Sequence, residues 1–353
     1  MSGLFLHCRA GFEKECAAEI QQRAGEAGVA GFCRALPHSG FVEYEAVDRD
    51  DGARRLVACL RFDTLVFARQ WFVVLQRNRA LPADDRVTAM LDGLRELPAP
   101  AGDLFVEHPD TNEGKSLSRL CKALRGPLNG ALNRAGLLAT DTDTRVHVCL
   151  LTGTDACMGY APVANSSPWP MGIVHLRLPR AAPSRATLKL DEALLQLLPS
   201  GERDRLVQPG MRAVDLGAAP GGWTWQLVRR HLRVIAVDNG AMAPALLESG
   251  LVDHRRADGF GFQPPSPVDW MVCDMVEQPR RIARLAAGWI RQGWCRHTIF
   301  NLKLPMKQRY PEVRRCLDAI ADELQSAGVR YRLACKQLYH DREEVTVYLG
   351  RTA

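Results

Sequence analysis

One short stretch, residues 212–223, constrains the fold of this chain more than any other. It reads Arg-Ala-Val-Asp-Leu-Gly-Ala-Ala-Pro-Gly-Gly-Trp, an apolar run that ends in Asp215 and Gly217 and precedes Pro220. This order predicts a buried strand, a tight turn and a helix start, where glycines let the backbone approach a ligand. The stretch lacks the Lys-Ser/Thr pair of a phosphate loop and the Gly-x-Gly-x-x-Gly spacing of a dinucleotide loop. It therefore predicts a nucleotide-cofactor loop, with an ordinary strand-turn-helix as the alternative.

Two later segments carry acids that suit a cofactor. The apolar run 234–237 ends at Asp238, 21 positions beyond Gly217. Doubly wound folds place a carboxylate at this distance to accept hydrogen bonds from ribose hydroxyls. Asp258 follows a third short segment, although its Asp-Gly sequence is also typical of a surface turn.

Four further segments carry groups suited to chemistry. Residues 270–275 and 298–304 read as buried strands that deliver Asp274 and Lys303 at their carboxyl ends. Glu344 opens the last strand, and Lys189 lies at the start of the first helix of this half. Ligands bind at the carboxyl ends of strands in open α/β sheets, so we expect these side chains at one site.

These motifs resemble those of a known enzyme family. The Asp-x-Gly-x-x-Pro-Gly-Gly form at 215–222 resembles motif I of the FtsJ-like ribose 2′-O-methyltransferases, and the order Lys189, Asp274, Lys303, Glu344 resembles their catalytic tetrad. The whole chain is most similar to the bacterial 23S ribosomal RNA cytidine 2′-O-ribose methyltransferase family, RlmM. The resemblance implies S-adenosylmethionine as cofactor, with Asp238 at its ribose and Asp258 near its adenine. The cofactor-binding residues it implies are Ser184, Ala219, Pro220, Gly221, Gly222, Trp223, Asp238, Asp258 and Asp274.

Lysine usage adds an argument from composition. Of 46 basic residues only seven are Lys, so 46 − 7 = 39 are Arg, and yet two Lys stand in the expected tetrad. Arginine is never deprotonated in proteins, whereas a lysine can act as a base when its pKa is lowered. Two nearby carboxylates would instead raise the pKa of Lys303. Whether Lys303 is a general base or an aligning group therefore stays open.

Signatures of other methyl-acceptor chemistries are missing. Methylation of a base at C5 uses a cysteine that usually follows proline, and no Pro-Cys occurs. Methylation of an exocyclic amine usually shows Asp or Asn before Pro-Pro and an aromatic residue, whereas here Asp274 precedes Met275 and Val276. Transfer RNA or another ribosomal nucleotide remains an alternative substrate. A non-catalytic RNA-binding or assembly protein with the same fold is the alternative from another class.

Composition also indicates the cellular compartment and the partners that we expect for this protein. The 11 cysteines form no Cys-x-x-Cys pair and the nine histidines occur singly, so we expect free thiols, a reducing compartment and no metal. We find neither a basic leader before a long apolar stretch nor about 18 uninterrupted apolar residues. We therefore expect a cytoplasmic protein without a membrane anchor. We also expect a monomer whose partner is free or pre-assembly 23S ribosomal RNA.

The segment 166–183, rich in Pro and Ser, is the expected domain boundary. Residues 1–180 hold 21 basic and 21 acidic side chains, whereas residues 181–353 hold 25 basic and 19 acidic, so the net charge of +6 lies in the second half. An excess of cations suits a domain that binds a polyanion. We predict a ferredoxin-like α+β unit at 1–75, an RNA-binding module at 76–175 that resembles the THUMP module, and a catalytic domain at 181–353.

Periodicity predicts the elements of each half. The first half shows strands near 4–8, 40–44, 70–75, 104–110, 145–151 and 156–161, and helices at 12–24, 51–60 and 115–135, the last rich in cations. The second half is predicted as an α/β, Rossmann-like and mostly parallel seven-stranded sheet with strands near 212–217, 234–238, 252–256, 270–274, 297–303, 330–338 and 344–349. Helices are expected near 187–199, 222–231, 280–292 and 311–327. The resemblance implies that the last strand is antiparallel.

A loop just after Lys303 combines cations with an aromatic ring. Lys307, Arg309 and Tyr310 would suit contact with an RNA backbone and stacking on a base. An ordinary loop that is ended by proline is the alternative. The helix at 115–135 has the same two interpretations, an RNA-contacting face or a solvated one.

Overall fold

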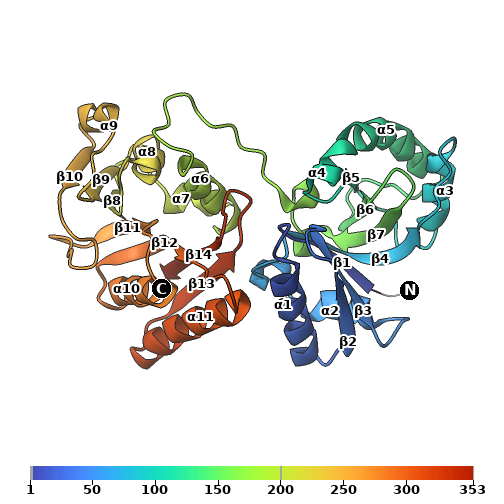
Figure 1. Ribbon diagram of the computed structural model, residues 1–353, viewed down its shortest axis with the longest axis horizontal. Coiled ribbons are helices and arrows are strands. Elements are labelled where there is room, and N and C mark those ends of the chain that lie inside the picture. Colours follow the sequence, from blue (N-terminus) through green and yellow to red (C-terminus); the bar gives the residue numbers. More distant parts are fainter. Residues whose placement is uncertain (1–2, 199–200, 353) are drawn as a thin grey trace. The chain divides into compact units, whose positions relative to one another are not determined.

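The chain folds into two compact units that divide between Ile173 and Val174, as seen in the computed structural model (Figure 1). The structure describes residues 3–198 and 201–352. Within these ranges no helix is long and apolar enough to cross a membrane. The same ranges contain no group of three or more His, Cys, Asp or Glu side chains that could hold a metal ion.

The first unit is built on one seven-stranded sheet with the order β2-β3-β1-β4-β7-β6-β5. All neighbours are antiparallel except β5 and β6. The strands are β1 (Gly3–His7), β2 (Gly31–Ala35), β3 (Phe41–Ala46), β4 (Gln70–Asn78), β5 (Asp103–Glu107), β6 (Thr144–Leu150) and β7 (Ala156–Pro162). β4 therefore joins the strands of residues 1–75 to those of residues 76–175 in a single sheet. β2 was not predicted, because this edge strand is largely exposed and lacks apolar alternation.

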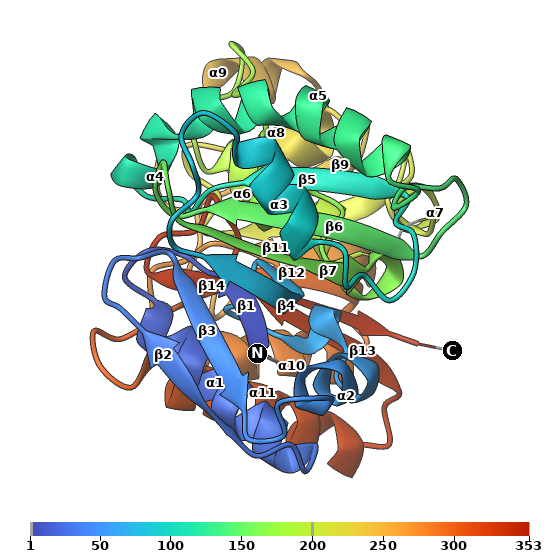
Figure 2. The same ribbon diagram turned by 90° about the vertical axis from the view of Figure 1, so that its right-hand side faces the viewer.

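Helices cover both halves of this sheet. They are α1 (Glu13–Glu26), α2 (Gly52–Cys59), α3 (Arg86–Gly93), α4 (Asn112–Ser116) and α5 (Ser118–Arg134). α1 and α2 contact the strands β1 to β4, while α3 contacts β4 and α5 packs on β5 (Figure 2). The predicted helix 115–135 is interrupted at Leu117 between α4 and α5, and α3 was not predicted.

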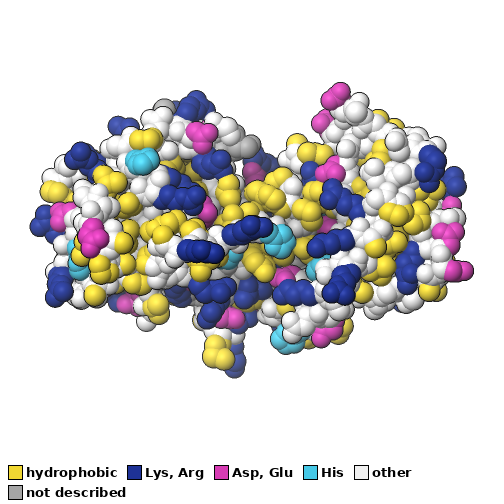
Figure 3. All heavy atoms as spheres, turned by 90° about the horizontal axis from the view of Figure 1, so that it is seen from above, with side chains coloured by type: hydrophobic (Ala, Val, Ile, Leu, Met, Phe, Trp, Pro, Cys, Tyr) yellow, Lys and Arg dark blue, Asp and Glu magenta, His cyan; other side chains and the backbone are white. Residues whose placement is uncertain are grey.

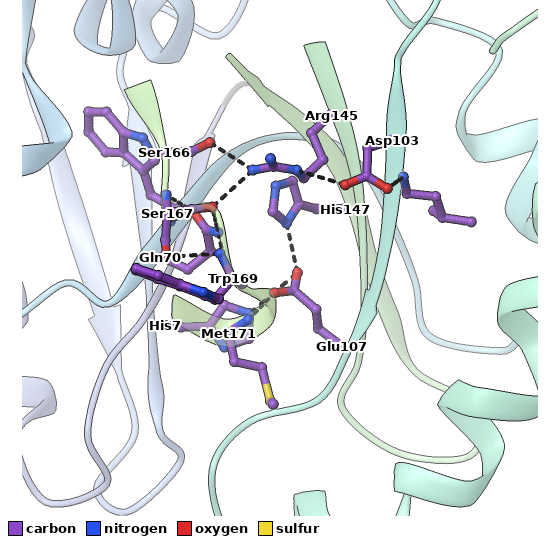
Figure 4. A network of polar contacts seen from close by, with 12 residues as sticks. His7, Gln70, Asp103, Glu107, Arg145, His147, Ser166, Ser167, Trp169 and Met171 are labelled. Carbon is purple, nitrogen blue, oxygen red and sulfur yellow. Dashed lines mark hydrogen bonds and ion pairs between the residues drawn. The ribbon is translucent and has the colours of Figure 1, made fainter. Parts of the chain in front are cut away.

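Buried polar side chains fasten the last segment of this unit to its sheet (Figure 4). The Gln70 amide donates to the carbonyls of Ser167 and Trp169 and accepts from the Ser167 N–H. The Arg145 guanidinium donates to the Ser167 carbonyl at 2.9 Å, and the Glu107 carboxylate accepts from the Met171 N–H. This segment is therefore an integral part of the first unit.

The second unit holds another seven-stranded sheet, with the order β10-β9-β8-β11-β12-β14-β13. Its strands are β8 (Arg212–Leu216), β9 (Arg233–Val237), β10 (Val252–Arg255), β11 (Val268–Cys273), β12 (Cys295–Lys303), β13 (Tyr331–Lys336) and β14 (Glu344–Arg351). The pairs β10–β9, β9–β8, β8–β11 and β11–β12 are parallel, and β14 runs antiparallel to both neighbours. The predicted Rossmann-like methyltransferase fold is confirmed.

Helices lie on both faces of the second sheet. They are α6 (Thr187–Gln196), α7 (Arg203–Leu206), α8 (Gly222–Val228), α9 (Pro244–Glu248), α10 (Pro279–Arg291) and α11 (Arg309–Ser326). Figure 1 shows α6 and α8 above the sheet and α10 and α11 below it. Leu190, Leu194, Trp223 and Leu227 pack against Trp270 and neighbours in the upper core. The predicted helix 187–199 ends earlier, and residue 199 lies outside the described residues. The predicted helix 222–231 ends at Val228.

Candidate active site

Four charged side chains meet at the carboxyl edge of the parallel strands. Asp274 follows β11 directly and Lys303 is the last residue of the neighbouring strand β12, so the two parallel strands deliver both side chains to one edge. β14 runs the other way and begins at this edge with Glu344, which is paired with Lys303 in register. Lys189 reaches the group from α6. The sequence-predicted set of four therefore lies together.

The four side chains form a closed ring of alternating charges, called here the tetrad ring. Lys303 Nζ lies 2.5 Å from Asp274 Oδ1 and contacts Glu344 Oε2. Lys189 Nζ lies 2.5 Å from Glu344 Oε1 and 3.3 Å from Asp274 Oδ2. Each lysine thus contacts both carboxylates, and each carboxylate uses its two oxygens on the two lysines. This arrangement fixes the position of both ammonium groups.

Charge pairing governs the protonation of the ring. Burial by itself would raise the pKa of Asp274, but the charges of Lys303 and Lys189 outweigh it and hold that pKa below its ordinary value. Burial would likewise lower the pKa of Lys303, but Asp274 and Glu344 hold it above the ordinary lysine value. Asp274 is therefore ionised, and Lys303 carries a proton at neutral pH.

The cofactor loop follows β8 in the predicted order. Gly217 has φ of +75° and Gly221, which precedes α8, has φ of +113°, both in the region that favours glycine. A Cβ at Gly222 would lie 2.4 Å from Ser184 Oγ, so this glycine allows the starts of α6 and α8 to pack closely. Trp223 is buried in the core between these helices. The backbone turn at Gly217 and Gly221 and the close helix packing at Gly222 are thus supplied by neighbouring glycines.

A cavity of about 620 Å³ lies beside the loop and reaches the tetrad ring. Of the predicted cofactor residues it is lined by Ala219, Asp238, Asp258 and Asp274. The predicted residues that do not line it are Ser184, Pro220, Gly221, Gly222 and Trp223. The sequence did not single out several other lining residues, namely Val237, Asn239, Ala257, Gly259, Phe260, Met275, Val276, Glu277 and Arg281. For most of them the available signal was their place at or near the end of a predicted strand, whereas Arg281 lies in the predicted helix 280–292.

The donor and acceptor groups of this cavity fit S-adenosylmethionine. Asp238 accepts the backbone N–H groups of Ala219 at 3.0 Å and Gly240 at 2.7 Å, which fixes its carboxylate at the end of β9. A carboxylate has about four acceptor positions, so capacity remains for ribose hydroxyls. Asp258 supplies a second acceptor at the cavity wall, and Phe260 adds an apolar face.

The side chains predicted to contact RNA differ in how far they are exposed to solvent. Tyr310 is buried at the start of α11, so its ring is not exposed for stacking on a base, and that prediction is wrong. Arg309 is bound to Glu343, whereas Lys307 is exposed. On α5, Arg119, Lys122, Arg125 and Arg134 are exposed. Figure 3 shows lysine and arginine side chains scattered over the visible face of each unit, with acidic side chains among them.

Comparisons with known proteins cover the whole chain. Family models match residues 1–72 (RlmM ferredoxin-like domain), residues 85–162 (ribosomal RNA large subunit methyltransferase M, N-terminal) and residues 182–292 (FtsJ-like methyltransferase). A ribosomal RNA large subunit methyltransferase M from Cellvibrio japonicus is 53% identical over 99% of both chains. One from Xanthomonas campestris is 51% identical over 99% of this chain and 100% of its own. Among solved structures, TrmN from Thermus thermophilus covers 100% of both chains at 17% identity and a TM-score of 0.37.

Proposed function

Because this chain belongs to the ribosomal RNA large subunit methyltransferase M family, we propose that it methylates the ribose 2′-hydroxyl of a cytidine in 23S ribosomal RNA. It is a methyltransferase of the FtsJ-like type, and its cofactor is S-adenosylmethionine. The observation that carries the ribose assignment is the tetrad ring beside the cofactor cavity, because Asp274 belongs to both.

The tetrad ring suits a hydroxyl as methyl acceptor. When bound, S-adenosylmethionine supplies an electrophilic methyl group. A ribose hydroxyl is a weak nucleophile until its proton is withdrawn or held by a hydrogen bond. In the proposal Lys303 contacts this hydroxyl, while Asp274 and Glu344 hold the ammonium group in place and Lys189 adds positive potential. Positioning by fixed partners contributes to the rate together with proton transfer.

The raised pKa of Lys303 has a kinetic consequence. Because its carboxylate partners hold the proton on the amine, Lys303 must lose that proton before it can accept one from the hydroxyl. If Lys303 is the base, the methyl-transfer rate rises with pH through the alkaline range. If Lys303 only aligns the hydroxyl, the protonated form is the active one and no such rise occurs.

We assign RNA capture to the first unit and chemistry to the second. The first unit, divided by sequence into 1–75 and 76–175, contributes none of the four tetrad residues, and its helix α5 exposes four arginine and lysine side chains. Such cations neutralise phosphates and strengthen RNA binding without reading sequence.

The test is methyl transfer from labelled S-adenosylmethionine to deproteinised ribosomal RNA, followed by nuclease mapping of the product. Label in a 2′-O-methylcytidine of 23S RNA supports the proposal. Label in transfer RNA or at another ribosomal nucleotide would move the substrate assignment but keep the chemistry. Normal binding of cofactor and RNA without transfer would instead favour a non-catalytic RNA-binding or assembly protein.

A further inference from the structure

A buried row of polar side chains lies directly behind the tetrad ring, and the sequence motifs do not include it. Asn301 on β12, Thr346 on β14 and Asp341 just before β14 are each no more than 1% exposed. Asn301 and Thr346 are paired in register across the two strands, two positions from the pair Lys303 and Glu344. Because side chains alternate along a strand, both pairs face the same side of the sheet.

Continuous hydrogen bonds link this row to Asp274. The Asn301 amide donates from Nδ2 to Asp274 Oδ1 at 2.9 Å, and Thr346 Oγ1 lies 2.8 Å from Asn301 Oδ1. Thr346 Oγ1 also lies 3.1 Å and 3.0 Å from the two oxygens of Asp341. Asp341 Oδ2 accepts the Leu338 N–H at 2.9 Å. The row ends on the same Asp274 oxygen that contacts Lys303.

The number of available hydrogen atoms determines which residue donates each hydrogen bond in the row. Only the NH₂ group of Asn301 can donate to the Asp274 carboxylate, so its carbonyl oxygen must accept the single hydroxyl hydrogen of Thr346. The close contact between Thr346 Oγ1 and Asp341 then needs a hydrogen supplied by Asp341. Burial, together with the charge of Glu344, raises the pKa of Asp341 well above its ordinary value, which agrees with a protonated carboxyl. Each member therefore donates toward Asp274.

We propose that Asp341, Thr346 and Asn301 form a one-way hydrogen-bond chain that positions Asp274 against Lys303. The three are positioning residues, and their effect on turnover rests on the function proposed above. The chain fixes the carboxylate of Asp274 and takes up part of its negative charge. Without it, the whole charge of Asp274 faces Lys303 and holds the lysine proton more tightly.

Other titratable groups surround the ring and stay in place in the test. Lys303 faces Asp274 from the end of β11 and Glu344 from β14, with Lys189 opposite on α6. Asp274 lies close enough to Cys273 and Asp215 to influence their pKa values, and Asp341 is also influenced by Glu344 and Glu192. A change at Thr346 removes none of these groups, and among them only Asp341 contacts Thr346, so a shift in Lys303 titration reports on the chain.

The first test reads the titration of Lys303 in the protein alone. The sequence contains only seven lysines, so protein labelled with ¹³C at lysine Cε gives a small set of NMR signals. The signal that is lost in Lys303→Arg is the signal of Lys303. Thr346→Val keeps the shape of the side chain but removes the hydroxyl, and we expect the pKa of Lys303 to rise by about half a unit to one unit. Thr346→Ser should restore the original titration. An unshifted Lys303 in folded Thr346→Val would overturn the proposal.

A second variant tests the direction of the chain without removing volume. Asp341→Asn can still donate to Thr346 and accept from Leu338, so the Lys303 titration should stay as in the unaltered protein, whereas Asp341→Ala should shift it. A shift of equal size in both variants would contradict donation by Asp341. These titrations need neither RNA nor cofactor. They can therefore contradict the hydrogen-bond chain while the proposed function stands, and they can support the chain even if the proposed function is wrong.

Steady-state kinetics test whether the hydrogen-bond chain affects methyl transfer. In Thr346→Val we expect kcat to fall about tenfold with the KM for S-adenosylmethionine nearly unchanged, and the alkaline rise of the rate to move to higher pH. Thr298→Val is the matched control, because Thr298 is equally buried on β12 but contacts Met271 instead of the ring. Equal losses in the two variants would show a general effect of strand packing and overturn the positioning role.

Discussion

Each unit holds a cluster of ionisable side chains on its sheet, and the two clusters differ in solvent exposure and in charge. In the first unit Glu107 accepts from His147 Nδ1 at 2.7 Å and from the Met171 N–H, with His7 at 3.9 Å. The side chains of Glu107 and His147 are fully buried, whereas Lys189 and Lys303 are 17% and 23% exposed. In the second cluster, Asp274 lines the cofactor cavity.

The protonation states sharpen this contrast. Burial lowers the pKa of His7 to about 4, so its imidazole is neutral at pH 7 and brings no charge to Glu107. In the tetrad ring each lysine ammonium group has three N–H donors and makes two ion contacts, so one donor remains on each. A cluster of ionisable groups is thus a candidate site when donors remain available and a substrate can reach them. The cluster around Glu107 is closed and supports structure.

Removal of the Glu107 carboxylate should produce the largest loss, and it should affect the stability of the first unit. Glu107→Ala leaves the His147 imidazole and the Met171 N–H without their buried partner, and we expect a loss of about 3–5 kcal/mol in the free energy of unfolding. Chemical denaturation measures it, with exposed Glu113→Ala as the control. A loss below about 1 kcal/mol would mean that Glu107 is not structural.

The matching variant in the second unit should affect ligand binding. Asp238→Ala removes the acceptor expected to hold the ribose of the cofactor, and we expect S-adenosylmethionine to bind about 10- to 100-fold more weakly. Calorimetric titration of the folded variant measures this affinity. Asp253→Ala, an exposed change on the neighbouring strand, should bind normally. Equal affinities for both variants would remove Asp238 from the cofactor site.

The two units should also respond oppositely to pH. Burial raises the pKa of Asp215 to about 7, above its ordinary value of 3.8, so the folded second unit binds this proton more strongly and loses stability as pH rises from 4 through 7. His7, lowered from 6.5 to about 4, makes the first unit lose stability as pH falls through that interval. At about 1.4 kcal/mol for each pKa unit, these contributions are at most roughly 3–4 kcal/mol each.

Denaturation of the Asp215→Asn and His7→Gln variants between pH 4 and 8 separates the two effects. The first change should reduce the loss of stability toward pH 7, and the second should reduce the loss toward pH 4. Unchanged pH profiles in both variants would contradict the assigned protonation states.

Deletion of the first unit gives the smallest expected effect on chemistry itself. A chain that begins at Ala181 keeps all four tetrad residues and the cofactor cavity. We expect it to bind S-adenosylmethionine normally but to lose about tenfold or more of its activity at RNA concentrations below saturation. Full activity at low RNA concentration would show that the first unit is not needed for capture.

Much of the second unit could be predicted from sequence, because its information is local. Apolar runs that end in a charged residue placed Asp274 and Lys303 at one edge, and parallel strands bring such ends together. The chain of Asn301, Thr346 and Asp341 escaped prediction, because its contacts depend on the register of β12 and β14. Two polar residues within these apolar strands were the available signal.

The burial of aromatic side chains is difficult to predict from the local sequence. Tyr310 was expected at the mouth of the site, but it is buried at the start of α11. The Trp223 side chain packs into the core, and its place beside the cofactor stays a prediction. Their sequence neighbourhoods contain glycines and cations that suit a ligand as well as a helix start. Which face of α8 and α11 is buried is decided by packing against the sheet, and this exceeds any local preference.

Single-turnover methyl transfer with saturating RNA, compared for the unaltered protein and for Lys303→Arg and Lys303→Ala, tests the central assignment most directly. Arginine keeps the positive charge but is never deprotonated, so if Lys303 takes the hydroxyl proton, both variants should lose about 10²-fold or more in rate while binding cofactor and RNA normally. Arginine should not rescue the loss seen with alanine. A near-normal rate for Lys303→Arg would contradict proton transfer by this residue and leave the tetrad ring a purely electrostatic role.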